Sequence, residues 1–172
     1  MKQIALILFS ILSVCSSNAQ SLKKYPIGNS GCSAYFLCVP DTFNFQLSPD
    51  SSDVYTGECS MEDVTYGIIC VKLKIPLNVN SDGEGILISY LDYLKSTYRI
   101  KEAAGYGKGH RLKNQEDTRG VIDYWKDVNG LNWKVKGWTN GKYITVMYVC
   151  TKNDVPETKA NIYLDGLLFP GM

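Results

Sequence analysis

Two Asn-Gly dipeptides, Asn129-Gly130 and Asn140-Gly141, are the features that most restrict how this chain can fold. Each lies between stretches in which apolar and polar residues alternate, and Asn-Gly favours the tight type I′ turn whose twist matches that of two antiparallel strands. We therefore expect a three-stranded meander over residues 121–151. Since a two-residue turn also sets the register, it predicts which side chains share a face of the sheet.

The predicted register gives the meander two faces of different character. With two-residue turns, Tyr124 lies opposite Val135, which in turn lies opposite Val146. The face that these residues share is apolar and is expected to form the core. The other face places aromatic rings beside charges that complement one another across strands, as recognition surfaces do. Its candidate binding residues are Trp125, Lys134, Lys136, Trp138 and Tyr143. The alternative is that a helix covers the apolar part of this face.

The segments before and after the meander predict an α+β fold on a twisted antiparallel sheet. Strands are expected at 33–39, 43–47, 54–58 and 64–75. A helix should begin at Ser81, because Ser81 and Glu84 form a capping box ahead of one apolar helical stripe. A second helix should begin near Asp154 and close the chain. We expect a single domain over 33–170, after a polar lead-in over 20–32.

This order of elements resembles the PsbP-like α-β-α sandwich, a fold named after an extrinsic photosystem II subunit and shared with small exported bacterial proteins. The resemblance is carried by the segment 36–43, the helix over 86–98, the meander over 121–151 and the closing segment 160–170. It implies a non-catalytic accessory, chaperone-like or binding module. It transfers no functional residue to this chain.

Residues 1–19 have the pattern of a secretory signal peptide. Lys2 supplies the charged start, an apolar run extends from Ile4 to Val14, and small residues end the segment at Ala19. We therefore expect cleavage before Gln20 and a soluble protein in the periplasm or outside the cell.

A lipid anchor on Cys15 is the alternative fate of the N-terminal segment. It is disfavoured because the residue before a lipidated cysteine is normally small, whereas here it is Val14. No apolar run approaches the roughly 20 residues that a membrane-spanning helix requires, so no transmembrane segment is expected.

Charge argues against nucleic acid as a partner. Lys2 is one of 18 basic residues, so 17 basic and 17 acidic residues remain after position 19. A balanced chain lacks the basic excess that binds nucleic acid or anionic membranes. No Cys/His cluster has the spacing of a zinc site, and we expect neither a metal nor a cofactor.

Five cysteines follow Cys15, and in an oxidising compartment they suggest one or two disulfides and at least one free thiol. Cys32 and Cys38 flank a predicted strand about 20 Å long and therefore cannot pair with each other. Cys32 with Cys59 is the expected disulfide, because both lie near predicted strand ends.

His110 is the only histidine, and it lies in a glycine-rich basic loop. Hydrolysis through a serine or cysteine nucleophile would have to use it, yet a solvated loop histidine is the simpler interpretation. Lys108, His110 and Arg111 are the candidate residues of an anion-binding loop. We expect a non-catalytic binding or accessory module that acts on a protein or a small ligand. The alternatives are an exported inhibitor or immunity-type protein and, less favoured, a small hydrolase using His110.

The signal-peptide pattern predicts that the exported chain begins at Gln20 and carries no lipid. Intact-mass measurement of secreted material tests this directly. A diacylglyceryl adduct on Cys15, or retention of residues 1–19, contradicts the prediction.

Overall fold

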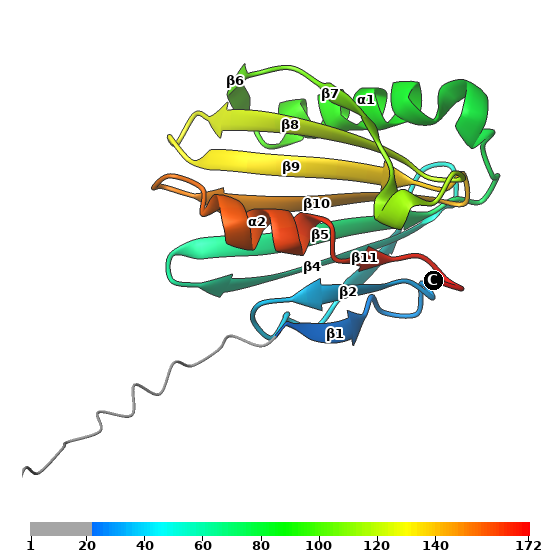
Figure 1. The fold of residues 1–172 in the computed structure, drawn as a ribbon, viewed down its shortest axis with the longest axis horizontal. Helices are drawn as coiled ribbons and strands as arrows, with labels where there is room; N and C mark the ends of the chain where they lie inside the picture. Colours follow the sequence, from blue (N-terminus) through cyan, green and yellow to red (C-terminus); the bar gives the residue numbers. More distant parts are fainter. Residues whose placement is uncertain (1–21) are drawn as a thin grey trace, which may run out of the picture.

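The structure, a computed structural model, describes residues 22–172 and is built around one large antiparallel sheet (Figure 1). This sheet has the strand order β3-β4-β5-β10-β9-β8-β6, with β7 also paired to β8. The strands are β3 (Asn44–Leu47), β4 (Asp53–Met61), β5 (Val64–Lys72), β6 (Ile100–Ala103), β7 (Gly107–His110), β8 (Arg119–Asp127), β9 (Asn132–Thr139) and β10 (Tyr143–Thr151).

The two faces of the large sheet are covered differently (Figure 1). Helix α1 (Val79–Thr97) packs on one face, over β8 and β9. The other face carries helix α2 (Glu157–Leu164) and a small sheet of order β1-β2-β11. The strands of the small sheet are β1 (Lys23–Pro26), β2 (Ser33–Phe36) and β11 (Leu167–Leu168). A 3₁₀ turn, η1 (Leu112–Asn114), precedes β8.

The expected α+β, PsbP-like sandwich is wrong. Within residues 22–172 the fold is largely β, with an eight-stranded antiparallel sheet and two α-helices. Segments interpreted from the sequence as a lead-in and as part of a closing helix instead contain β1 and β11. Both pair with β2 and form a second, small sheet with it. In the expected sandwich, a helix would have covered this part of the large sheet.

Helix α1 begins slightly earlier than the capping box predicts. Asn78 is the cap, and its side-chain oxygen accepts a hydrogen bond from the Asn80 backbone N–H at 3.1 Å. The apolar stripe of the helix is confirmed, since Leu87, Leu91 and Leu94 are buried against the large sheet.

The connection between β8 and β9 is one residue longer than expected. The Asp127 N–H donates to the Leu131 carbonyl at 3.1 Å, and Gly130 has φ +80°, so residues 128–130 form a type I turn with a glycine bulge. Asp123, and not Tyr124, therefore lies opposite Val135. A shift of one residue moves every β8 side chain to the other face of the sheet.

The connection between β9 and β10 is two residues longer than expected. This changes which residues of the two strands lie opposite each other, but not the face of the sheet on which each side chain lies. Val135 lies opposite Tyr148 instead of Val146, and residues 140–143 lie between the paired residues Thr139 and Ile144. Because the shift is even, the predicted faces of β9 and β10 are confirmed.

The β8 register buries the carboxylate of Asp123 beneath α1. Asp123 has no exposed surface, and it accepts hydrogen bonds from the Lys95 ammonium at 2.9 Å and from Trp125 Nε1 at 2.7 Å. The backbone N–H groups of Gly105 and Tyr124 donate to its second oxygen at 3.0 and 2.8 Å. A charge can be buried when it is paired and hydrogen-bonded in this way.

Lys95 remains charged at this position. Burial acts to lower the pKa of Lys95, but hydrogen bonds from its ammonium to Tyr106 and Asp123 outweigh burial and raise that pKa. The Tyr106 hydroxyl in turn donates to Asp92 on the exposed side of α1. A continuous polar network therefore joins α1 to β8.

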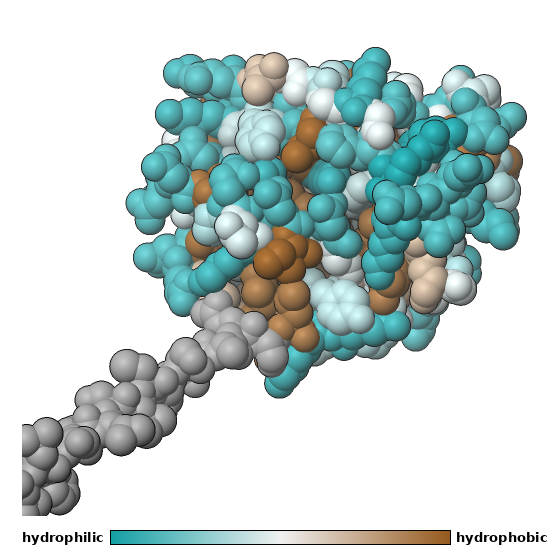
Figure 2. Space-filling view, in the orientation of Figure 1, coloured by the Kyte–Doolittle hydropathy of each residue, from teal (hydrophilic) through white to brown (hydrophobic). Residues whose placement is uncertain are grey.

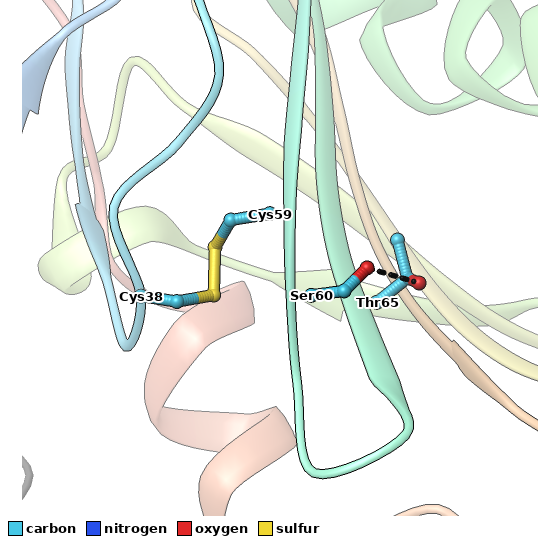
Figure 3. The surroundings of a disulfide bond; sticks show 4 residues. All are labelled: Cys38, Cys59, Ser60 and Thr65. Carbon is cyan, nitrogen blue, oxygen red and sulfur yellow. Dashed lines mark hydrogen bonds between the residues drawn. A yellow bond between two sulfur atoms is a disulfide. The ribbon is translucent and has the colours of Figure 1, made fainter.

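The disulfide of the structure joins Cys38 to Cys59 (Figure 3). The expected pairing of Cys32 with Cys59 is wrong, because Cys32 and Cys38 lie at opposite ends of β2 and the Cys38 end lies beside β4. Within residues 22–172, Cys32, Cys70 and Cys150 are free and buried.

The signal segment, Cys15 and the cleavage site before Gln20 lie outside the described residues. Among residues 22–172, no helix has both the length and the apolar character needed to cross a bilayer.

Replacing Asp123 with alanine should lower the free energy of unfolding by about 3–5 kcal/mol, because it leaves Lys95 and three N–H groups without their buried acceptor. The matched control is Asp92→Ala, which removes an exposed member of the same network and should cost less than about 1 kcal/mol. Urea denaturation of both variants measures the difference. Equal losses would contradict the structural role of Asp123.

Candidate functional site

The five residues predicted as one binding surface do not share an exposed face. Trp125 packs beneath α1, whereas Lys134, Lys136, Trp138 and Tyr143 lie on the opposite face of the large sheet. All five are buried. The alternative that a helix covers this face holds for Trp138 and the two lysines, and the one-residue shift in β8 separates Trp125 from them.

The predicted surface instead receives α2. Lys134 forms an ion pair with Glu157, and Lys136 forms one with Asp165 at 2.6 Å. The Lys136 ammonium also lies 4.5 Å from the centre of the Trp138 ring, whose Nε1 donates to a carbonyl at the end of α2. From outside, this side of the molecule is largely hydrophilic, with apolar surface gathered toward the start of the described chain (Figure 2).

Some polar groups of the candidate anion loop already form hydrogen bonds within the protein. Arg111 donates to backbone carbonyls at 2.8 and 3.0 Å, while Lys108 is exposed. Burial and the nearby Lys136 lower the pKa of His110, so its imidazole is neutral near pH 7. A carboxylate oxygen of Glu84 accepts from the Gly109 N–H at 2.8 Å, which places negative charge at the loop backbone. Anion binding here stays a prediction.

A cleft of about 600 Å³ lies beside α1, on the half of the large sheet that the helix leaves uncovered. Its floor is mainly apolar and comes from β4, β5, β10 and the residue that follows β5: Val54, Thr56, Ile69, Val71, Leu73 and Ile144. Its wall consists of Tyr90 and Tyr93 in the C-terminal half of α1 and of Tyr98, the residue that caps the helix. The volume falls within the roughly 300–1,000 Å³ of small-molecule sites, and an apolar lining with few polar groups is typical of them.

The tyrosine wall is held in place by ring packing. Tyr90 and Tyr93 stack with ring centres 6.0 Å apart, and Tyr98 packs against Trp133 at 5.0 Å. Burial, with Tyr93 and Tyr98 nearby, raises the pKa of Tyr90 to about 12, so its hydroxyl is neutral at physiological pH. Tyr93 is 62% exposed and is therefore available to a ligand.

Carboxylates line the cleft and the hollow beside it. In the cleft, Asp50 accepts hydrogen bonds from the hydroxyls of Ser48 and Ser52, which lower its pKa and keep it ionised. Past Tyr98, an adjoining hollow of about 320 Å³ reaches Glu58, which accepts from the Tyr148 hydroxyl at 3.0 Å.

No lysine or arginine lines the cleft or the adjoining hollow among the residues that the structure describes. The combined site is consequently acidic, aromatic and apolar. The sequence interpretation assigned Tyr90 and Tyr98 to the core stripe of the helix, and it missed the site because the cleft depends on which strands α1 does not cover. The feature of the sequence that could have indicated the site is the presence of three tyrosines within nine residues, at positions 90, 93 and 98.

Comparison with known proteins assigns no family: no family model matches the chain, and no curated protein matches it. The PsbP-like relationship therefore stays a prediction, while the sandwich it implied is corrected above.

Because α2 covers Trp138, its replacement by alanine should lower the free energy of unfolding by about 3–5 kcal/mol. Tyr124→Ala is the matched control, because Tyr124 lies on the same face and is 41% exposed. This replacement should lower the free energy of unfolding by about 1 kcal/mol or less. Denaturant melts of the two variants decide the matter. A Trp138→Ala variant as stable as the control would mean that α2 does not cover this residue in solution.

Proposed function

We propose that this chain is an exported, non-catalytic binding module whose site is the cleft between α1 and strands β3–β5, and that its ligand is a small organic cation with an apolar body. The observation that carries the proposal is an apolar sheet surface bordered by tyrosines, with Asp50 in its lining and Glu58 in the adjoining hollow. Export is supported by the signal-peptide pattern and by the Cys38–Cys59 disulfide, a bond that persists in oxidising compartments.

The charge of the ligand follows from the lining. Tyrosine faces attract cations through their ring quadrupole, which contributes about 0.5–2 kcal/mol depending on desolvation. Asp50 and Glu58 add Coulombic attraction, and the lining offers an anion no basic partner. An anionic ligand would therefore lose hydration without compensation.

The apolar body of the ligand would lie on the floor of the cleft. Val54, Ile69, Val71 and Ile144 line the cleft and keep 6–7% of their surface exposed. Covering them displaces water from apolar surface, which favours binding by about 25 cal/mol per Å². A flat or ring-shaped body also stacks against the exposed Tyr93.

Three probes of matched size test the charge class: benzyltrimethylammonium, neutral N-benzylacetamide and anionic benzylsulfonate. NMR titration should show the cation binding about tenfold more tightly than the neutral probe, as about 1.4 kcal/mol of added attraction predicts. The anion should bind more weakly than both. Equal affinities for the three probes would refute the charge assignment.

Variants locate the binding in the cleft. Thr56→Trp fills the floor and should abolish binding, and Tyr93→Ala should weaken the cation about fivefold. Tyr124→Ala, on the opposite face, is the control and should leave affinity unchanged. Glu58→Gln keeps the acceptor for Tyr148 and should weaken the cation while leaving the neutral probe unaffected. Binding that survives Thr56→Trp in a folded protein would overturn the site.

A further inference from the structure

Two of the three free thiols come from different layers of the fold and meet in one core. Cys32 directly precedes β2 in the small sheet, and Cys70 lies on β5 in the large sheet. Their exposed fractions are 2% and 0%. Both belong to the hydrophobic core between the two sheets, whereas Cys150 belongs to the core beneath α1.

The turn that precedes β2 is fixed against the large sheet. The Tyr143 hydroxyl donates to the Ser30 carbonyl at 3.0 Å, and the Cys32 N–H donates to Ser30 Oγ at 3.0 Å. On the large sheet, Cys70 lies opposite Thr145, which is two residues from Tyr143 on β10 and shares its face. The hydrogen bonds of this turn therefore place Cys32 above Cys70.

The two thiols belong to one buried cluster and act on each other. Cys70 Sγ accepts a hydrogen bond from the Thr145 hydroxyl at 3.6 Å, and a side-chain hydrogen bond between Cys32 and Cys70 shifts the pKa of both thiols. That hydrogen bond and burial raise the pKa of the Cys32 thiol well above its usual value. Because both sulfurs are buried, an external oxidant does not reach them in the folded protein, so their oxidation belongs to the folding stage.

We propose that Cys32 and Cys70 form a second disulfide in the exported protein. The two S–H bonds break and one S–S bond forms. The two protons and two electrons pass to a disulfide oxidant, such as a thiol-oxidising protein or glutathione disulfide, which is reduced to two thiols. Cys38–Cys59 already links one end of β2 to the large sheet, and the second bond links the other end. Cys150 remains the free thiol.

Thiol counting tests the pairing in the full chain carrying Cys15→Ala, refolded in a glutathione redox buffer, denatured and alkylated without reduction. With both disulfides formed, wild type should take up one alkyl group, Cys150→Ala none, and Cys32→Ala or Cys70→Ala two each. If Cys38–Cys59 alone forms, wild type takes up three and Cys150→Ala two, which would overturn the proposal. Refolding by glutathione makes the outcome independent of export and of the cleft ligand.

Fragment mapping identifies the partners. Residues 25–71 contain no lysine or arginine, so trypsin leaves all four cysteines in one peptide. Chymotrypsin followed by a glutamate-specific protease separates them, and a fragment pair joining Cys32 to Cys70 is expected. Pairing of Cys32 with Cys38 or Cys59 would refute the assignment.

Thermal melts distinguish a covalent link from simple packing. Cys32→Ala and Cys70→Ala should each lower Tm by about 10 °C under oxidising conditions, and the double variant should lower it no further. After reduction, the difference between wild type and the single variants should shrink. Losses that add in the double variant would show that the two residues act as separate packed side chains.

Discussion

The buried carboxylate of Asp123 determines how the α1 side of the molecule is arranged. A charge without exposed surface requires a partner of opposite charge, and Lys95 on α1 is that partner at 2.9 Å. The pair holds α1 over β8 and β9, and it stabilises the β8 register that turns Trp125 inward. With α1 held at this end of the sheet, β4 and β5 are left beside the helix, and the tyrosine-lined cleft is the space between them.

On the opposite face of the large sheet, buried charges are again paired with opposite charges, but here the sheet carries the cations. Here the sheet carries the buried cations Lys134 and Lys136, and the elements packed on it supply the carboxylates of Glu157 and Asp165. Helix α2 is short, and its ion pairs complement the packing of its buried side chains. Both helices thus dock on the sheet through at least one ion pair involving a buried residue, which specifies their position more narrowly than apolar contact does.

Much of the secondary structure was predictable from the sequence, because alternation and helical periodicity are local properties. The β8 register was not, because it depends on competition at the turn. Asp127 Oδ1 accepts from the N–H groups of Asn129 and Leu131, each at 2.9 Å, and this favours the bulged turn over the two-residue turn that Asn-Gly suggests. The resulting shift of β8 by one residue places Trp125 and Trp138 on opposite faces of the large sheet. The cleft was less predictable still, since it is defined by the strands that a helix does not reach.

The cleft and the cysteines occupy opposite faces of the same strands. On β5, Ile69 and Val71 form the cleft floor, while Cys70 between them points to the other core. On β4, Glu58 lines the hollow, and its neighbour Cys59 carries the disulfide to Cys38. These strands lie toward the β3 edge of the sheet, away from the support that α1 gives to β8 and β9. A covalent link on their reverse face restrains these strands without occupying the cleft, so the floor of the cleft is held in shape by bonds that do not fill it.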